Sequence, residues 1–152
     1  MGFLTGKTAI ITGAGRAVLK DGSCGYGIAT AYAKEGANLV ITGRNVKKLE
    51  AAKQELESLY GIKVLTVQAD VCAGGDNEAT VANVVKQAVD TFGGIQVLIN
   101  NAQASASGVP LAEHTTEQFD LAIYSGLYAA FYYMKACYPY LAESHGSVIN
   151  FA

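Results

Sequence analysis

Residues 7–27 read KTAIITGAGRAVLKDGSCGYG, and this stretch decides the fold. It opens with a short apolar, β-branched run, Lys7 to Thr12, which ends at Gly13 and is typical of a buried strand. The alanine-rich run from Ile28 to Glu35 predicts a helix, and Gly36 stands where a left-handed helix cap is expected. The chain therefore begins with a strand, a glycine-rich loop and a helix.

The same alternation continues to the end of the sequence. Apolar runs predict further strands at 38–42, 63–69, 95–100 and 147–151, and helical spacing predicts helices at 46–60, around 81–92 and over 116–141. The last helix is expected to run for about six turns and to be capped by Thr116. Alternating strands and helices require right-handed crossovers, so the predicted fold class is α/β, a doubly wound parallel sheet.

Composition limits the classes of function. The 152 residues fit one domain, and a net charge of -2 without a stripe of basic residues argues against a nucleic-acid partner. No apolar run reaches the roughly 18 residues of a membrane span, and the first residues lack a signal-peptide pattern, so a cytoplasmic protein is expected. The cysteines Cys24, Cys72 and Cys137 share no C-x-x-C spacing, so neither a metal site nor a disulfide framework is indicated.

The glycines bracket a predicted phosphate site. Gly13 directly follows the first strand, and Gly25, Tyr26 and Gly27 are expected to precede the first helix directly. Free N–H groups at a helix start carry partial positive charge, and glycine lets the main chain approach an anion closely. Glycines also occur in ordinary tight turns, but a strand before them and a helix after them favour a nucleotide pyrophosphate.

Two motifs carry a resemblance to a known family. The sequence resembles the short-chain dehydrogenase/reductase family, whose T-G-x-x-x-G-x-G motif corresponds here to Thr12-Gly13 and Gly25-Tyr26-Gly27, with eight extra residues between them. The family's N-N-A-G motif corresponds to Asn100-Asn101-Ala102-Gln103. The resemblance covers the whole chain. It implies a Rossmann sheet in strand order 3-2-1-4-5 and an oxidoreductase that interconverts an alcohol and a ketone by hydride transfer.

Within the family, residues 100–108 (NNAQASASG) and 124–128 (YSGLY) are most similar to the bacterial 12α-hydroxysteroid dehydrogenases. This similarity implies a small-molecule alcohol or ketone substrate, with a hydroxysteroid as the candidate. Neither composition nor spacing indicates a steroid, so the substrate expectation rests on the resemblance alone.

The end of the second predicted strand bears on the choice of cofactor. An acidic residue there accepts a hydrogen bond from the 2′-hydroxyl of NAD, whereas arginine pairs with the 2′-phosphate of NADP. The chain has Thr42-Gly43-Arg44, which predicts NADP(H) rather than NAD. Arg16 and Lys20 are expected to add positive charge near the same phosphate. The alternative is that Arg44 is an ordinary solvated residue.

The resemblance assigns further cofactor contacts. It implies that Asp70 and Val71 contact the adenine and that Asn100, Asn101 and Ala102 line the ribose on the nicotinamide side. Asp70 alternatively serves as a turn or capping residue.

The family's catalytic residues are not found in this sequence. A serine and a Tyr-x-x-x-Lys pair carry the proton chemistry in the family, and the chain contains no Tyr-x-x-x-Lys. Alignment places the serine directly after Ala152, so residues 1–152 are expected to be one NAD(P)-binding domain, truncated before the catalytic segment and inactive alone. No catalytic residue is therefore assigned. A fourth family residue, an asparagine, aligns with Gly126, which alternatively bends the helix. A catalytically inert nucleotide-binding fragment or pseudoenzyme remains the other interpretation.

The helix predicted over 116–141 is rich in aromatic residues. Its resemblance to the family's helices implies a homo-oligomer formed through 119–141 in a full-length protein. The alternative is that another part of a longer chain covers these rings.

Overall fold

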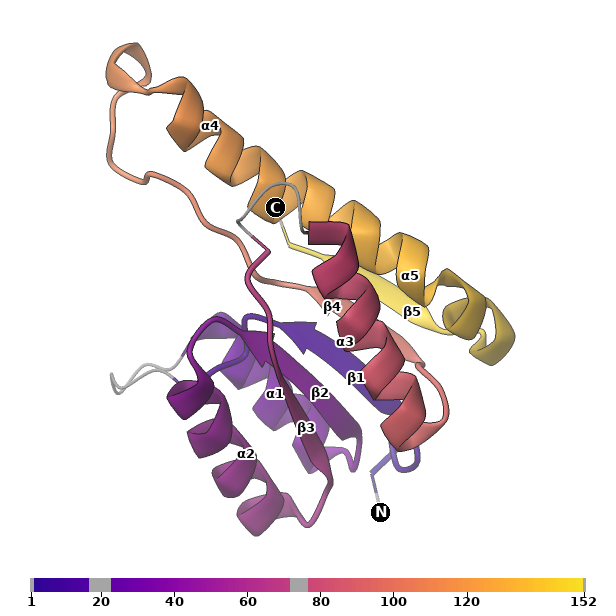
Figure 1. The fold of residues 1–152 in the computed structure, drawn as a ribbon. Coiled ribbons are helices and arrows are strands. Elements are labelled where there is room, and N and C mark those ends of the chain that lie inside the picture. Colours follow the sequence, from indigo (N-terminus) through magenta and orange to yellow (C-terminus); the bar gives the residue numbers. More distant parts are fainter. Residues whose placement is uncertain (1, 17–22, 72–76, 152) are drawn as a thin grey trace.

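The computed structural model describes residues 2–16, 23–71 and 77–151. Five parallel strands form one sheet in the order β3-β2-β1-β4-β5 (Figure 1), which confirms the predicted fold class and strand order. The elements are β1 (Thr8–Thr12), α1 (Cys24–Lys34), β2 (Asn38–Gly43), α2 (Val46–Tyr60), β3 (Val64–Gln68), α3 (Asn77–Phe92), β4 (Val97–Asn100), the 3-10 helix η2 (Leu111–Glu113), α4 (Thr116–Ala122), the π-helical segment η3 (Ile123–Tyr128), α5 (Ala129–Ser144) and β5 (Ser147–Asn150).

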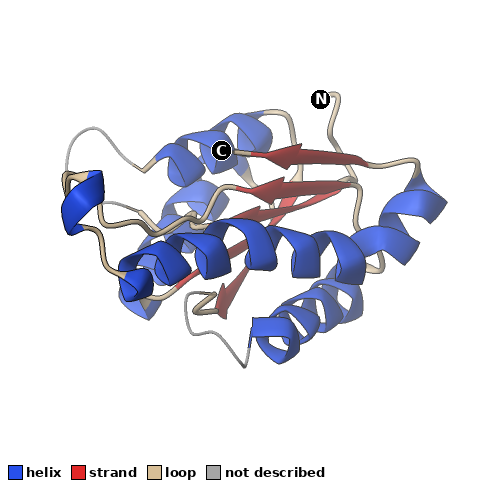
Figure 2. Ribbon diagram, turned by 90° about the horizontal axis from the view of Figure 1, so that it is seen from above, coloured by secondary structure: helices blue, strands red, loops and turns tan. Residues whose placement is uncertain are grey.

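Alternate residues of the central strands point to two separate cores. Ile10, Val40 and Leu98 pack beneath α3 and α5, whereas their strand neighbours Ile11 and Ile41 pack beneath α1 and α2. Helices therefore cover both sides of the sheet (Figure 2). With both faces buried, a strand needs a continuous apolar run instead of an alternating one, which is why these strands were readable in the sequence.

The first helix begins earlier than predicted. α1 starts at Cys24, so Gly25, Tyr26 and Gly27 lie in its first turn, and the prediction that they precede the helix was wrong. The reason is a cap: the Ser23 side chain accepts a hydrogen bond of 3.2 Å from the Tyr26 N–H. Gly36, with φ of +84°, takes the left-handed conformation predicted for the end of this helix.

The long predicted helix is present as the uninterrupted series α4, η3 and α5, and its cap is displaced by one residue from the prediction. Thr115, not Thr116, caps α4 and shares a capping box with Gln118. The helix then widens into η3, where the Ala129 N–H bonds to the Tyr124 carbonyl five residues earlier. The helical path extends to Ser144, beyond the predicted end.

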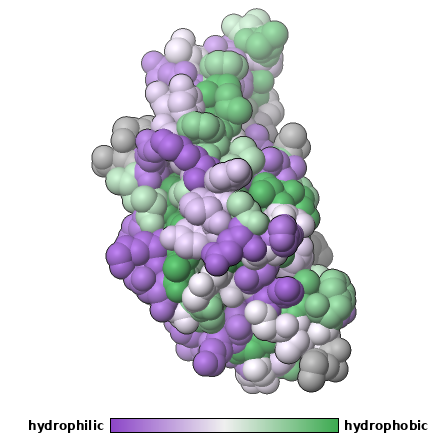
Figure 3. Space-filling view, turned by 90° about the vertical axis from the view of Figure 1, so that its right-hand side faces the viewer, coloured by the Kyte–Doolittle hydropathy of each residue, from purple (hydrophilic) through white to green (hydrophobic). Residues whose placement is uncertain are grey.

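Apolar side chains remain exposed at the β5 edge and along the last helices. Val148 and Ile149 of β5 are 40% and 43% exposed. Figure 3, which shows the side at the right of Figure 1, has apolar patches separated by polar side chains rather than one continuous apolar face. Within the described part of the chain, no helix is long and apolar enough to cross a membrane.

Candidate functional site

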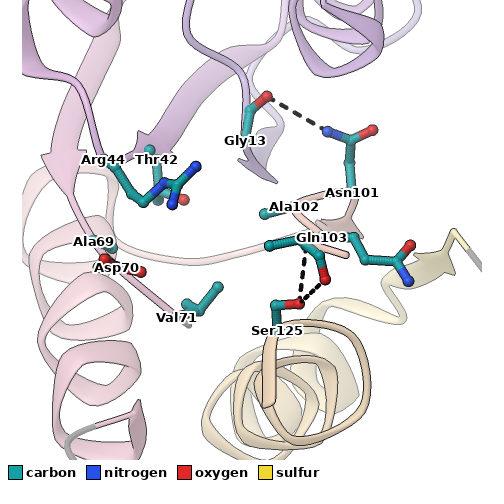
Figure 4. A pocket seen from close by; sticks show the side chains of 12 residues that line it. Gly13, Thr42, Arg44, Ala69, Asp70, Val71, Asn101, Ala102, Gln103 and Ser125 are labelled. Atoms are coloured by element: carbon teal, nitrogen blue, oxygen red, sulfur yellow. Dashed lines mark hydrogen bonds between the residues drawn. The ribbon is translucent and has the colours of Figure 1, made fainter. Parts of the chain in front are cut away.

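A pocket of about 200 Å³ lies at the carboxyl ends of the strands (Figure 4). Strand order reverses between β1 and β4, and ligands of doubly wound sheets bind in the crevice at such a switch point. The lining residues follow four of the strands and include one residue of η3: Gly13, Thr42, Gly43, Arg44, Ala69, Asp70, Val71, Asn101, Ala102, Gln103, Ala104 and Ser125.

Thr12 joins the two sequence motifs in space. Its buried hydroxyl accepts hydrogen bonds of 2.9 Å from the backbone N–H groups of both Asn101 and Ala102. The Asn101 side-chain amide in turn donates to the Thr12 carbonyl at 3.0 Å. The end of β1 and the loop after β4 are therefore one hydrogen-bonded unit, and the pocket floor is fixed by the fold.

Gly25 lets the start of α1 approach this unit. A Cβ added at Gly25 would lie 2.4 Å from the Gly13 carbonyl oxygen and 2.6 Å from the Asn101 amide nitrogen. Gly13 itself has φ of +70°, a conformation that side chains rarely adopt. Gly27 differs, because a Cβ there would meet no heavy atom within 4 Å. Of the two α1 glycines predicted as phosphate contacts, only Gly25 is required by close packing.

Arg44 and Asp70 lie together at one end of the pocket. Figure 4 shows the Arg44 guanidinium directed into the space between Gly13 and Asp70. The Arg44 carbonyl accepts a 3.1 Å hydrogen bond from Gln68, which fixes the backbone there. Among the residues that the structure describes, no carboxylate forms an ion pair with the Arg44 guanidinium. An exposed cation that forms no ion pair within residues 2–16, 23–71 and 77–151 can bind an anion.

Arg16 does not line the pocket. Its side-chain Nε atom lies 2.6 Å from a Glu55 carboxylate oxygen on α2. Its backbone N–H donates to the Lys48 carbonyl at 3.0 Å. Burial, followed by the negative charge of Glu55, raises the pKa of the Tyr26 phenol. Arg16 and Tyr26 thus belong to a polar cluster with Glu55, outside the residues that line the pocket. Lys20 falls outside the described residues.

Asn100 and Gly126 also lie apart from the main pocket. The Asn100 amide donates to the Asn150 side-chain oxygen at 2.8 Å and so links β4 to β5. Both Asn100 and Gly126 line a smaller cavity of about 10 Å³, together with Tyr133. Burial raises the pKa of the Tyr133 phenol above its usual value.

Sequence reasoning missed Ser125. Its buried hydroxyl accepts from the Ala104 N–H at 2.9 Å and lies 3.0 Å from the Ala104 carbonyl and 2.7 Å from the Leu121 carbonyl. Ser125 therefore fastens the loop after β4 to η3. A single serine inside an apolar helical run gives no signal of this contact, because it depends on the π-helical turn.

The glycine-lined pocket at the switch point of a doubly wound sheet defines a nucleotide-binding α/β protein. A family model described as short chain dehydrogenase matches residues 7–152, and the chain belongs to this family. The resemblance read from the two motifs is confirmed.

Individual relatives agree with this assignment. The chain is 62% identical over 152 residues to a 12alpha-hydroxysteroid dehydrogenase of Clostridium sp. (strain ATCC 29733 / VPI C48-50), covering 100% of this chain and 57% of that protein. It is similar in structure to L-sorbose reductase from Gluconobacter frateurii complexed with NADPH and L-sorbose, with 30% identity, a TM-score of 0.83, and coverage of 97% of this chain and 52% of that one. An NAD+-bound xylitol dehydrogenase matches with 26% identity, a TM-score of 0.84, and coverage of 97% and 53%. The chain spans about half the length of the curated relatives it matches.

Proposed function

We propose that residues 1–152 form a single domain that binds NADP(H) in the pocket at the carboxyl ends of the strands. The 2′-phosphate pairs with Arg44, the adenine lies against Asp70 and Val71, and the pyrophosphate lies over Gly13 and the start of α1. The nicotinamide half then extends towards Asn101 and Ala102. The single observation that carries this proposal is Arg44, an exposed guanidinium at the pocket that forms no ion pair with a described residue.

Physical chemistry supports each part of this arrangement. A guanidinium forms paired, charge-assisted hydrogen bonds with phosphate, and a helix N-terminus attracts the pyrophosphate. Gly43 places no carboxylate beside the ribose, where an acidic side chain would repel a 2′-phosphate. The NADPH complex of L-sorbose reductase agrees with the preference, while the NAD+-bound xylitol dehydrogenase shows that the fold alone does not dictate it.

The test is a calorimetric titration of the purified chain with NADPH and with NADH. The proposal predicts saturable 1:1 binding of NADPH and affinity for NADH at least about tenfold weaker, since charge-assisted bonds to the 2′-phosphate are absent from NADH. Equal affinities, or tighter NADH binding, would refute the NADP(H) assignment. Absence of binding by either nucleotide would refute the cofactor site itself.

We also propose that a longer protein containing this sequence would be an oxidoreductase that interconverts an alcohol and a ketone. A hydroxysteroid is the candidate substrate because the relative at 62% identity is a 12alpha-hydroxysteroid dehydrogenase. When bound, NADPH would supply the hydride for ketone reduction, and NADP+ would accept it in alcohol oxidation. Because the 152 residues contain no Tyr-x-x-x-Lys pair, the chain alone is expected to bind cofactor without oxidising 12α-hydroxysteroids. Steroid-dependent NADPH formation by this chain would contradict that expectation.

The aromatic face of η3 and α5 is proposed as the contact between two copies of the longer protein. Leu127, Phe131 and Tyr138 are 65%, 51% and 71% exposed, and the rings of Tyr124 and Tyr128 lie 5.3 Å apart. Exposed apolar surface of this kind is typical of a protein interface. Light scattering would show a dimer or larger assembly for the longer protein, and Phe131→Ser would shift it towards monomer. A monomer at all concentrations would refute the proposal.

A further inference from the structure

Gln103 lies beside Gly126, although the two residues are 23 positions apart in the sequence. A Cβ added at Gly126 would lie 3.5 Å from the Gln103 amide nitrogen and 3.8 Å from its Cδ and Cγ atoms. The glutamine side chain therefore lies next to the space that a side chain longer than alanine at position 126 would enter. Both residues depart from the family motifs, which have glycine and asparagine at these places.

The Gln103 carboxamide is exposed at the end of the pocket farthest from Arg44 and Asp70. Figure 4 shows it directed away from those two residues, on the β4 side of the pocket. Among the described residues, none forms a hydrogen bond with its amide group. A carboxamide carries two donors and an acceptor, so this group is available to a polar ligand.

The backbone that carries Gln103 is held on both sides. Asn101 and Ala102 are tied to Thr12, and Ala104 is tied to Ser125. The side chain is thus presented from a fixed loop, which lowers the entropy lost when its amide binds a ligand.

We propose that the Gln103 carboxamide is a cofactor-binding group that hydrogen-bonds to the nicotinamide half of NADP(H), and that glycine at position 126 leaves room for it. This inference rests on the proposed function: once the adenosine 2′-phosphate is held at Arg44, the other half of the dinucleotide must cross the pocket towards Gln103. The ribose hydroxyls and the nicotinamide carboxamide both offer complementary donors and acceptors.

The experiment compares NADPH with adenosine 2′,5′-bisphosphate, which lacks the nicotinamide half, as calorimetric ligands of the same chain. Gln103→Met keeps the length of the side chain and removes its hydrogen bonds. It is expected to raise the Kd of NADPH about threefold to tenfold and to leave the Kd of adenosine 2′,5′-bisphosphate unchanged. Unchanged NADPH affinity, or an equal loss for both ligands, would overturn the inference. Failure of the parent chain to bind either ligand would instead refute the proposed function.

A second comparison tests the contact with position 126. Gly126→Asn places a side chain in the space that Gln103 occupies and should weaken NADPH binding as much as Gln103→Met does. In a chain that already carries Gln103→Met, adding Gly126→Asn should cause little further loss, because the interaction is already gone. Gly126→Ala is the control, since a Cβ at 3.5 Å makes only ordinary contact. Additive losses in the double variant would contradict the proposed coupling.

Discussion

Replacing Arg44 with alanine should weaken NADP(H) binding and leave NAD(H) binding unchanged. Hydrogen bonds to charged groups contribute about 1.5–3 kcal/mol each. Because Arg44 is exposed and its charge is screened by solvent and salt, we expect the lower end of that range, about 1.5 kcal/mol, which corresponds to about a tenfold rise in Kd. The fold should be unaffected, since the backbone carbonyl that Gln68 binds is retained.

The assay is a titration of the parent chain and of Arg44→Ala with NADPH and NADH at low and moderate salt. Arg44→Lys is the matched control: it keeps the charge without the planar fork, so an intermediate Kd for NADPH is expected. The difference in the Kd of NADPH between the parent chain and Arg44→Ala should become smaller as ionic strength rises. An Arg44→Ala chain that binds NADPH as tightly as the parent, or that loses NADH affinity equally, would refute the assignment of the 2′-phosphate to this residue.

The substitution Gly43→Asp also tests whether the ribose and its 2′-phosphate bind at the end of β2. Gly43→Asp would place a carboxylate beside the ribose, and a Cβ at this position lies 3.5 Å from Leu49, so the backbone accommodates it. The preference should then move towards NADH, because the carboxylate repels the 2′-phosphate and accepts from a 2′-hydroxyl. An unchanged ratio of the two Kd values would mean that the ribose lies elsewhere.

Three further predictions follow from the packing of the site. Gly25→Ala should destabilise the chain by about 1–3 kcal/mol in denaturant unfolding, because its Cβ would overlap backbone atoms; Gly27→Ala, at an open helical position, is the control, and equal stability of the two variants would contradict this account. Ser125→Ala should cost about 1 kcal/mol, because the part-buried Ala104 N–H loses its acceptor, and an unchanged unfolding midpoint would show that the loop after β4 is held by other contacts. In a chain that carries Cys72→Ser, exposed Cys24 should react with a maleimide at pH 8, and bound NADPH should protect it. Cys137 should not react in the folded chain, because burial raises the pKa of its thiol to about 12. Cys24 labelling that is indifferent to NADPH would argue against a nucleotide over the start of α1.

The sequence predicted most of the fold because its local signals agree with the tertiary structure. The runs in β1, β2 and β4 are buried on both faces, so apolarity alone identified them. Gly36, predicted as a helix cap, has the positive φ that such a cap requires. The pocket could also be located, since the carboxyl ends of parallel strands meet at one edge.

What the sequence could not show depends on contacts between distant residues. Arg16 forms an ion pair with Glu55, 39 positions later, a contact that no local pattern in the sequence indicates. The π-helical turn at η3 and the Ser125 contact with Ala104 arise only when the loop after β4 packs against the helix. Likewise, the first turn of α1 includes Gly25 because Ser23 caps it, and residue-by-residue helix propensity disfavours glycine there.

The most direct test of the central claim is a crystal structure of this chain with NADP(H) bound. We expect the 2′-phosphate within hydrogen-bonding distance of the Arg44 guanidinium, the adenine against Asp70, and the nicotinamide half beside Asn101 and Gln103. A nucleotide bound in the opposite direction, or a 2′-phosphate that contacts no part of Arg44, would contradict this claim.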